Sequence, residues 1–244
     1  MQFWQLSMVK KPSRTDRITK LVQAKINNII PDKVHHTITT AIEQMVKAVL
    51  FGAAYTADIA LEDGSLVYRE AYIRRKIDFY QKTATAEGAI TGAGGILMGL
   101  ADFPLLIGIK IKMLFDIASL YGYDMRDYKE RLYILYVFQL AFSSQHRRNE
   151  IYQLMEGWQG YTKTLPEHEE DFDWRTFQQE YRDYIDLAKM AQLIPVIGAA
   201  VGAIANYQLI AQLGKTAMNC YRMRKISPLK VIEDTNRKTG RSFC

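Results

Sequence analysis

The chain has 244 residues, of which 48% are hydrophobic and 24% are charged. This length is enough to bury a sizeable core in one large domain or two small ones, and this composition excludes disorder for the bulk of the chain. The only two cysteines, Cys220 and Cys244, exclude a disulfide framework and a zinc site with paired cysteines. We therefore expect a folded protein of a reducing cytoplasm, and the first residues contain no apolar run of signal-peptide length.

The net charge of +6 is concentrated at the two ends of the chain. Residues 1–30 hold six Lys or Arg against one Asp, and residues 222–244 hold seven against two acids, so the middle is mildly acidic. Basic ends indicate contact with a polyanion, for which anionic lipid is at least as good a candidate as nucleic acid. The alternative is that these charges only keep the protein soluble.

Apolar residues recur at helical spacing and no strand-like alternation is evident, which predicts an all-α multi-helix bundle. A first helix is expected to end near Pro31, a second to cover residues 38–53, and a third to follow a turn at 63–65. This third helix carries Ile73, Ile77 and Tyr80 on one face.

The next segment, EGAITGAGGILMGLADFPLLIGIKIK at residues 87–112, is rich in glycine and yet apolar. We predict two helices, at about residues 83–100 and 103–121. Asp102 is the expected N-cap of the second helix because Pro104 fits a first helical turn, and Gly122 is the expected C-cap.

Asp124 is expected to cap a further helix that continues to Met155. A loop is predicted at 157–173 and a helix at about 174–193. Pro195 then opens a last helix that ends near Arg222. The predicted organisation is a basic N-terminal helix or arm at 1–33, a helical domain at 34–223, and a basic C-terminal tail at 224–244.

Two groups of glycines are expected to allow close approach of helices. Gly88, Gly92, Gly95 and Gly99 would form one stripe on the predicted 83–100 helix, and the last helix repeats the pattern with Gly198 and Gly202. Each glycine costs a helix about 0.8–1 kcal/mol relative to alanine, so a neighbouring helix must compensate by packing closely.

The alternative for the glycine-rich segment is a membrane hairpin. Residues 88–109 contain no ionisable group except Asp102, and these 22 residues are long enough to span a bilayer. Because Asp102 and Pro104 lie at the middle of that window, a re-entrant hairpin fits better than a simple span.

The sequence resembles the EcsC family over roughly residues 40–226. The resemblance lies in EGAITGAGGILMGLADFPLLIGIKIKMLFDIASLYGYD, the later IPVIGAAVGAIANYQ, and a basic YRMRK. Members resemble one another at positions that are here Glu87, Gly88, Gly92, Gly95, Asp102, Pro104, Lys112, Tyr121, Gly122, Pro195, Gly198, Gly202 and Asn206. The family is named after a bacterial protein encoded beside an ABC transporter of secretion and regulation and has no established biochemical activity. The resemblance implies a helical fold and, by genomic association alone, a membrane partner such as an ABC transporter.

Catalytic and cofactor motifs are absent from the sequence. The glycines match neither a phosphate-binding loop nor a dinucleotide fingerprint, and no HExxH or GxSxG occurs. The acidic run EHEEDFD at 167–173 matches no Ca²⁺ loop. We therefore expect no metal and no cofactor.

Five polar residues remain in the glycine-rich blocks as a candidate site: Glu87, Thr91, Asp102, Lys112 and Asn206. Charged groups beside close-packed helices must be paired. One hypothesis is structural, with Asp102 as a helix cap and a Glu87–Lys112 ion pair that fixes the hairpin's register. The other is a polar pocket in which two carboxylates and a lysine bind a ligand or perform acid/base hydrolysis.

We expect a non-enzymatic accessory or regulatory protein of the bacterial cytoplasm, peripheral to the inner face of the cell membrane. Its expected partners are an anionic membrane surface or a membrane protein such as an ABC transporter. The rival hypothesis is a hydrolase-type enzyme or ligand-binding protein that uses Glu87, Asp102 and Lys112. Nucleic-acid binding ranks last because the sequence shows no recognition motif.

Overall fold

The computed structural model confirms the predicted all-α multi-helix fold. It describes the backbone of residues 1–9, 32–51, 65–93, 95–143, 145–177, 181 and 198–239. The helices in these ranges are α1 (Gln2–Val9), α3 (Asp32–Phe51), α4 (Leu66–Ala93), α5 (Gly95–Leu120), α6 (Tyr128–Phe142), α7 (Gln145–Glu156), α8 (Trp158–Tyr161), the 3₁₀ turn η1 (Glu169–Asp171) and α11 (Gly198–Thr239).

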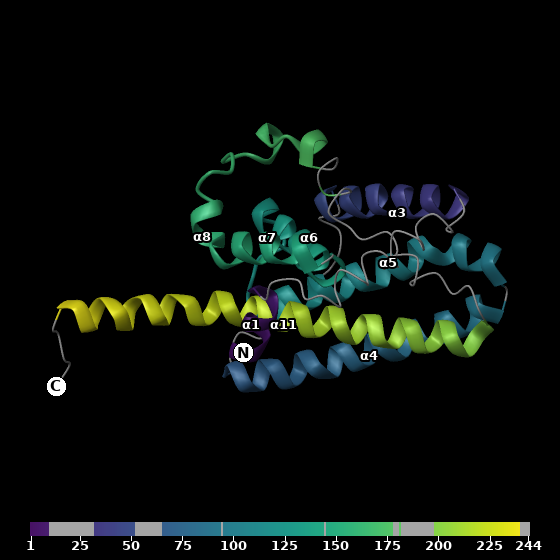
Figure 1. Cartoon of the computed structure of the whole chain (residues 1–244), viewed down its shortest axis with the longest axis horizontal. Coiled ribbons are helices and arrows are strands. Elements are labelled where there is room, and N and C mark those ends of the chain that lie inside the picture. The colour runs from purple at the N-terminus through teal and green to yellow at the C-terminus, as the bar shows by residue number, and fades with distance from the viewer. Residues whose placement is uncertain are drawn as a thin grey trace.

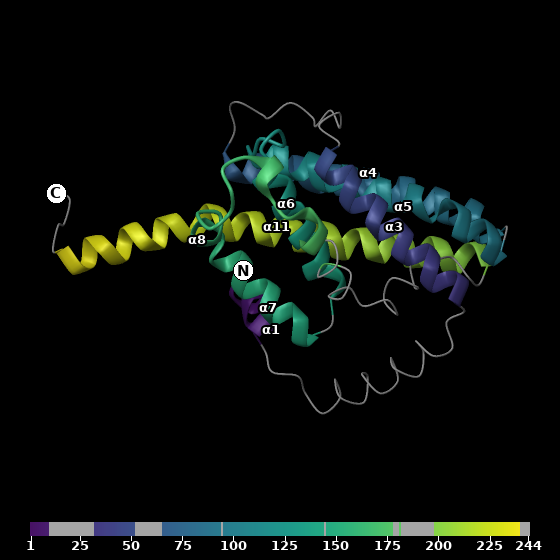
Figure 2. The same cartoon turned by 90° about the horizontal axis from the view of Figure 1, so that it is seen from above.

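Three long helices, α4, α5 and α11, lie side by side along the longest axis of the molecule (Figures 1 and 2). α4 and α5 form a hairpin. The Gln81 side-chain amide donates to the Tyr207 carbonyl at 3.3 Å, and Glu70, earlier on α4, pairs with Arg222, later on α11. Because one residue number rises along these pairs while the other falls, α11 runs antiparallel to α4.

α6 is the central helix of the fold. Thirteen of its fifteen residues are buried, and it contacts α3, α5, α7 and α11. Its run LYILYVFQLAF is apolar on every side, and such a helix is stable only when it is covered all round. Tyrosine hydroxyls secure the cover, since Tyr133 donates to the Cys220 carbonyl at 3.1 Å and Tyr181 to the Leu135 carbonyl at 2.9 Å.

The ends of α5 and α6 show why the chain turns between them. Gly122 has φ of 86°, a left-handed conformation that glycine adopts without a steric penalty, and this confirms it as the C-cap of α5. The predicted cap of the next helix is wrong by three residues. Asp127, rather than Asp124, accepts from the Lys129 amide at the start of α6, while Asp124 pairs with Arg126.

The hairpin turns eight residues earlier than predicted, between Ala93 and Gly95. α5 is helical through Asp102 and Pro104, so Asp102 is not an N-cap. A proline inside a helix removes one backbone hydrogen bond, and α5 as a whole packs against α3, α4 and α11. Four glycines predicted to share one helix are therefore divided between two: Gly88 and Gly92 on α4, and Gly95 and Gly99 on α5.

The other helix boundaries differ less from the predicted ones. α3 confirms the predicted second helix, whereas the predicted first helix and the segment around Pro195 lie outside the described residues. The helix expected to continue to Met155 is divided into α6 and α7, and the 157–173 loop contains the short α8 and η1. α11 continues past Arg222 as far as Thr239, and its end projects from the body (Figures 1 and 2).

Close approach of helices is visible at Gly214 on α11. A Cβ atom added there would lie 2.8 Å from Ile77 Cδ1, 2.9 Å from Cγ1 and 3.0 Å from Cγ2. Ile77 on α4 cannot swing away easily, because a β-branched side chain has one strongly preferred χ1 rotamer in a helix. The contact between α4 and α11 therefore depends on the absence of a side chain at residue 214.

We predict that Gly214→Ala lowers the free energy of unfolding by about 1–3 kcal/mol, because overpacking exceeds the gain in helix propensity. Gly108→Ala is the matched control, since nothing lies within 4 Å of a Cβ added at Gly108 on α5. In this control the free energy of unfolding is expected to rise by about 0.5–1 kcal/mol. Urea denaturation measures both, and equal effects of the two substitutions would contradict the close approach.

Candidate functional site

Of the predicted polar residues, Asn206 lies in a buried polar pair whose partner is Lys110. The Lys110 ammonium on α5 donates to Asn206 Oδ1 and to the Leu106 carbonyl, each at 3.2 Å. Both residues are almost completely buried. Burial lowers the pKa of Lys110 to about 7 because the charged ammonium is removed from water. At neutral pH this lysine is therefore poised between its charged and neutral forms.

Lys112 lies on a different side of α5 and pairs with Asp116, one helical turn later. Asp116 is 1% exposed, accepts from the Tyr80 hydroxyl at 2.6 Å, and has Lys76 at 4.0 Å. A buried carboxylate is tolerated only when it is paired and hydrogen-bonded in this way. Lys112 thus joins α4 to α5 through Asp116, which sequence analysis did not single out.

The remaining predicted site residues lie on the helices of the hairpin. Glu87 and Thr91 are near the end of α4, and Asp102 is within α5. Their side chains are outside the described residues, as are those around the glycines of both blocks. The predicted Glu87–Lys112 pair and the predicted polar pocket therefore remain predictions.

Two further ion pairs join α11 to other helices. The Arg222 guanidinium contacts both oxygens of Glu70, at 2.5 and 2.6 Å, and holds the pKa of Glu70 below its usual value. Arg224 contacts both oxygens of Glu130 at 2.6 and 2.7 Å, and its guanidinium lies 4.0 Å from the centre of the Tyr123 ring. Fork-shaped contacts of this kind fix the register of packed helices. We interpret both pairs as structural.

A surface that combines exposed basic and apolar side chains lies on the outer side of α4, and we call it the α4 face. Its exposed residues share one side of the helix and are Val67, Tyr68, Ala71, Arg74, Arg75, Asp78, Phe79 and Lys82. Val67 is 79% exposed, Tyr68 59% and Phe79 58%. Three cations and one carboxylate are thus interleaved with three large apolar side chains.

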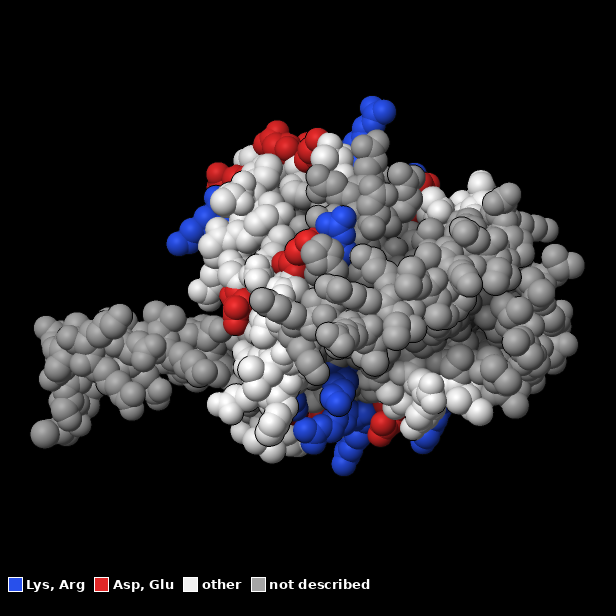
Figure 3. All heavy atoms as spheres, in the orientation of Figure 1, with Lys and Arg blue, Asp and Glu red and all other residues white. Residues whose placement is uncertain are grey.

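Acidic side chains gather on another side of the molecule. Figure 3 shows them over the segment of α8 and η1, whereas basic side chains gather along the lower edge, over α4. The acidic segment contains Glu167, Glu169, Glu170, Asp171 and Asp173. Basic side chains also lie on that upper side, so the separation of charge is partial.

Among the helices that the structure describes, none combines the length and the apolar character that crossing a membrane requires.

The sequence is similar to known proteins over most of its length. The model of the EcsC protein family matches residues 1–226. The chain is 45% identical to Protein EcsC of Bacillus subtilis (strain 168) over 91% of each chain. It is 33% identical to the uncharacterized protein YdbA of the same organism, over 64% of this chain and 56% of that one. No solved structure is significantly similar to it.

Sequence reasoning missed Lys110, although the signal was present. Leu106, Lys110 and Leu114 are spaced four residues apart, so Lys110 occupies the middle of an apolar stripe on α5. Leu106 and Leu114 are both fully buried. The family resemblance pointed to Lys112 instead as the candidate site residue.

We predict that wild-type stability rises by about 2 kcal/mol from pH 6.5 to 8.5 through Lys110, because its pKa is about 7 in the folded protein and 10.5 for an ordinary lysine. Between these values the unfolded chain holds a proton that the folded protein has released, so raising the pH favours folding. Below pH 7 both states are protonated and the destabilisation is complete.

Urea denaturation of the wild type and Lys110→Met over this pH range measures the effect. The variant is expected to lose the pH-dependent rise. Lys110→Met/Asn206→Leu is expected to be more stable than Lys110→Met, because the single variant leaves the Asn206 amide buried without its lysine partner. Parallel pH profiles of wild type and Lys110→Met would contradict a depressed lysine pKa.

Proposed function

Because this chain belongs to the EcsC protein family, whose activity is not established, we propose a function from its surface: a non-enzymatic accessory protein that binds the inner face of the cell membrane. The observation that supports this most is the α4 face. A peripheral protein needs exposed apolar groups for the interfacial region and cations for the lipid headgroups, and both lie on one helix here.

Two cations of the α4 face lie on the same side of the helix, so both can contact a flat membrane surface at once. Arg75 and Lys82 are seven residues apart, which is two helical turns, so they lie on one side of α4 with Phe79 between them. Phe79 projects with 58% of its surface exposed. The two cations are therefore expected to contact headgroups while Phe79 enters the boundary of the acyl chains.

The basic ends of the chain add to the same attraction. Residues 1–30 carry a net charge of +5 and residues 222–244 also carry +5. Each Lys or Arg close to an anionic leaflet contributes about 1 kcal/mol, which salt screens within a Debye length. Binding is therefore expected to weaken steeply with ionic strength.

We also propose that the accessory role concerns a membrane protein such as an ABC transporter. The support is the genomic association of the family, which is a weaker kind of support than a contact surface. The rival hydrolase hypothesis uses Lys112, whose ammonium is paired with Asp116. Within the described residues no observation favours that hypothesis over membrane binding.

We predict that Arg75→Gln/Lys82→Gln weakens binding to vesicles of 30% phosphatidylglycerol and 70% phosphatidylcholine by roughly 10- to 30-fold, since two headgroup contacts of about 1 kcal/mol each are lost. Vesicle co-sedimentation measures the effect. Lys163→Gln/Arg175→Gln is the matched control, because it removes the same charge from exposed residues on either side of η1.

The control is expected to change binding less than twofold beyond the general effect of net charge. Equal losses in the two double variants would show that only net charge matters and that the α4 face is not the contact. Absence of wild-type binding to these vesicles at low salt would contradict the proposed function as a whole.

A further inference from the structure

One side of α1 is fixed to the body through α7. The Trp4 ring packs edge-on against Tyr152 of α7, with ring centres 5.8 Å apart, and Met8 is buried. The Asn149 side-chain amide, also on α7, donates to the Val9 carbonyl at 3.4 Å. These contacts hold α1 in place and leave its other side exposed.

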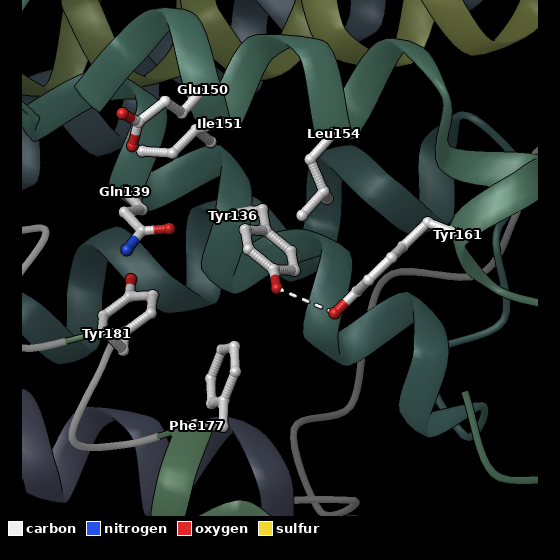
Figure 4. A pocket seen from close by; sticks show the side chains of 8 residues that line it. All are labelled: Tyr136, Gln139, Glu150, Ile151, Leu154, Tyr161, Phe177 and Tyr181. Atoms are coloured by element: carbon white, nitrogen blue, oxygen red, sulfur yellow. Dashed lines mark hydrogen bonds between the residues drawn. The ribbon is translucent and has the colours of Figure 1, made fainter. Parts of the chain in front are cut away.

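α7, which supports α1, is itself part of the core. It packs against α6, and Ile151 and Leu154 of α7 line a small cavity together with Tyr136 of α6 (Figure 4). Ile151 is buried. α1 therefore rests on a helix that is anchored in the body of the protein.

The exposed side of α1 is apolar. Phe3 is 90% exposed, more than any other large apolar side chain among the residues that the structure describes, and Leu6 is 63% and Val9 42% exposed. These three residues, which we call the α1 strip, are spaced three apart along the helix, and no residue of α1 is charged. Single exposed apolar residues are common on protein surfaces, but neighbouring ones on one helix form a patch that indicates a contact.

A cluster of cations follows the α1 strip in the sequence. Residues 10–20, KKPSRTDRITK, contain five Lys or Arg and one Asp. The structure of this segment lies outside the described residues, but the sequence alone puts Lys10 and Lys11 directly after the last residue of α1. Exposed apolar groups joined to clustered cations are typical of segments that bind anionic lipid.

α1 and α4 lie on one side of the molecule. Both are at the lower edge of the body in Figure 1, and Figure 2, turned by 90°, shows that they are separated along that edge. A flat surface that contacts the α4 face can therefore reach α1 as well.

A lipid surface fits the α1 strip better than a protein partner does. A specific protein interface covers about 800 Å² on each partner and excludes lysine from its centre, whereas the strip consists of three side chains beside a pair of lysines. α1 has eight residues and a length of about 12 Å, so it can lie within the headgroup region but cannot cross a bilayer.

We propose that α1 is an interfacial membrane anchor, and that the α1 strip enters the boundary between the lipid headgroups and the acyl chains. This inference rests on the proposed function and extends it, because the α4 face carries three cations and α1 carries none. Trp4 and Met8 stay packed on α7 when the strip enters the lipid. Because salt screens the cations of the α4 face but not apolar contacts, the anchor makes part of the binding resistant to salt.

Co-sedimentation of the full chain with the same phosphatidylglycerol vesicles, at low and at high salt, tests the proposal. Phe3→Ser/Leu6→Ser is expected to weaken binding at least roughly 10-fold and to abolish the part that resists salt, since most of the inserted apolar area is lost. Leu105→Ser/Ile204→Ser is the matched control, because Leu105 on α5 is 52% and Ile204 on α11 59% exposed. The control is expected to bind as the wild type does.

The depth of α1 in the lipid is a second measurement. The fluorescence of Phe3→Trp is expected to be quenched by lipids that carry bromine on their acyl chains, beyond the quenching of the wild type. Ile204→Trp is the control, and its added tryptophan is expected to stay unquenched.

Absence of wild-type binding would contradict the proposed function and the anchor together. Wild-type binding that Phe3→Ser/Leu6→Ser leaves intact would overturn the anchor alone, as would equal losses in the two serine variants or equal quenching in the two tryptophan variants. A wild-type dimer in light scattering that Phe3→Ser/Leu6→Ser converts to a monomer would assign the α1 strip to a second copy of the chain and would also overturn the anchor.

Discussion

The burial of α6 is the constraint on which the rest of the structure depends. A helix that is apolar on every side cannot form part of a surface, so other elements must cover each of its sides. α11 and α7 supply much of this cover, and an aromatic cluster that includes Trp158, Phe177 and Tyr181 completes it. The small cavity lies in this last layer, where rings of fixed shape pack against each other and leave space.

The ion pairs between helices contribute to the structure in a different way from the apolar core. Glu70 with Arg222 and Glu130 with Arg224 connect helices that are far apart in the sequence, and partly buried pairs of this kind add less to stability than to register. Most of the free energy that stabilises the folded state comes from apolar packing. The pairs decide which of several similar helix alignments the chain adopts, because a slip of one turn would leave two buried charges without partners. The ion pairs therefore contribute to the specificity of the fold more than to its stability.

Helical class, the presence of α3 and the cap at Gly122 could be predicted because each depends on local spacing, although α3 begins six residues before the predicted start. The turn of the glycine-rich hairpin could not, because Asp102 and Pro104 form a strong local signal for a helix start that packing overrides in α5. Partners more than ninety residues apart, such as Glu130 and Arg224, are not encoded in any local pattern. The α4 face was missed for another reason, because net charge alone indicates the ends of the chain. The spacing of Arg75, Phe79 and Lys82 nevertheless places them on one side of a helix.

Lys110 makes the protein less stable at neutral and lower pH than its packing would allow, because its charged form is buried. The Lys110 ammonium has two acceptors, and closely packed side chains of α5 and α11 surround it. Its lowered pKa is accounted for by burial alone and requires no ligand. A buried group of this kind signals a binding site only when space and complementary chemistry lie in front of it. The Lys110 ammonium instead has its acceptors in place on α5 and α11, so this lysine belongs to the core.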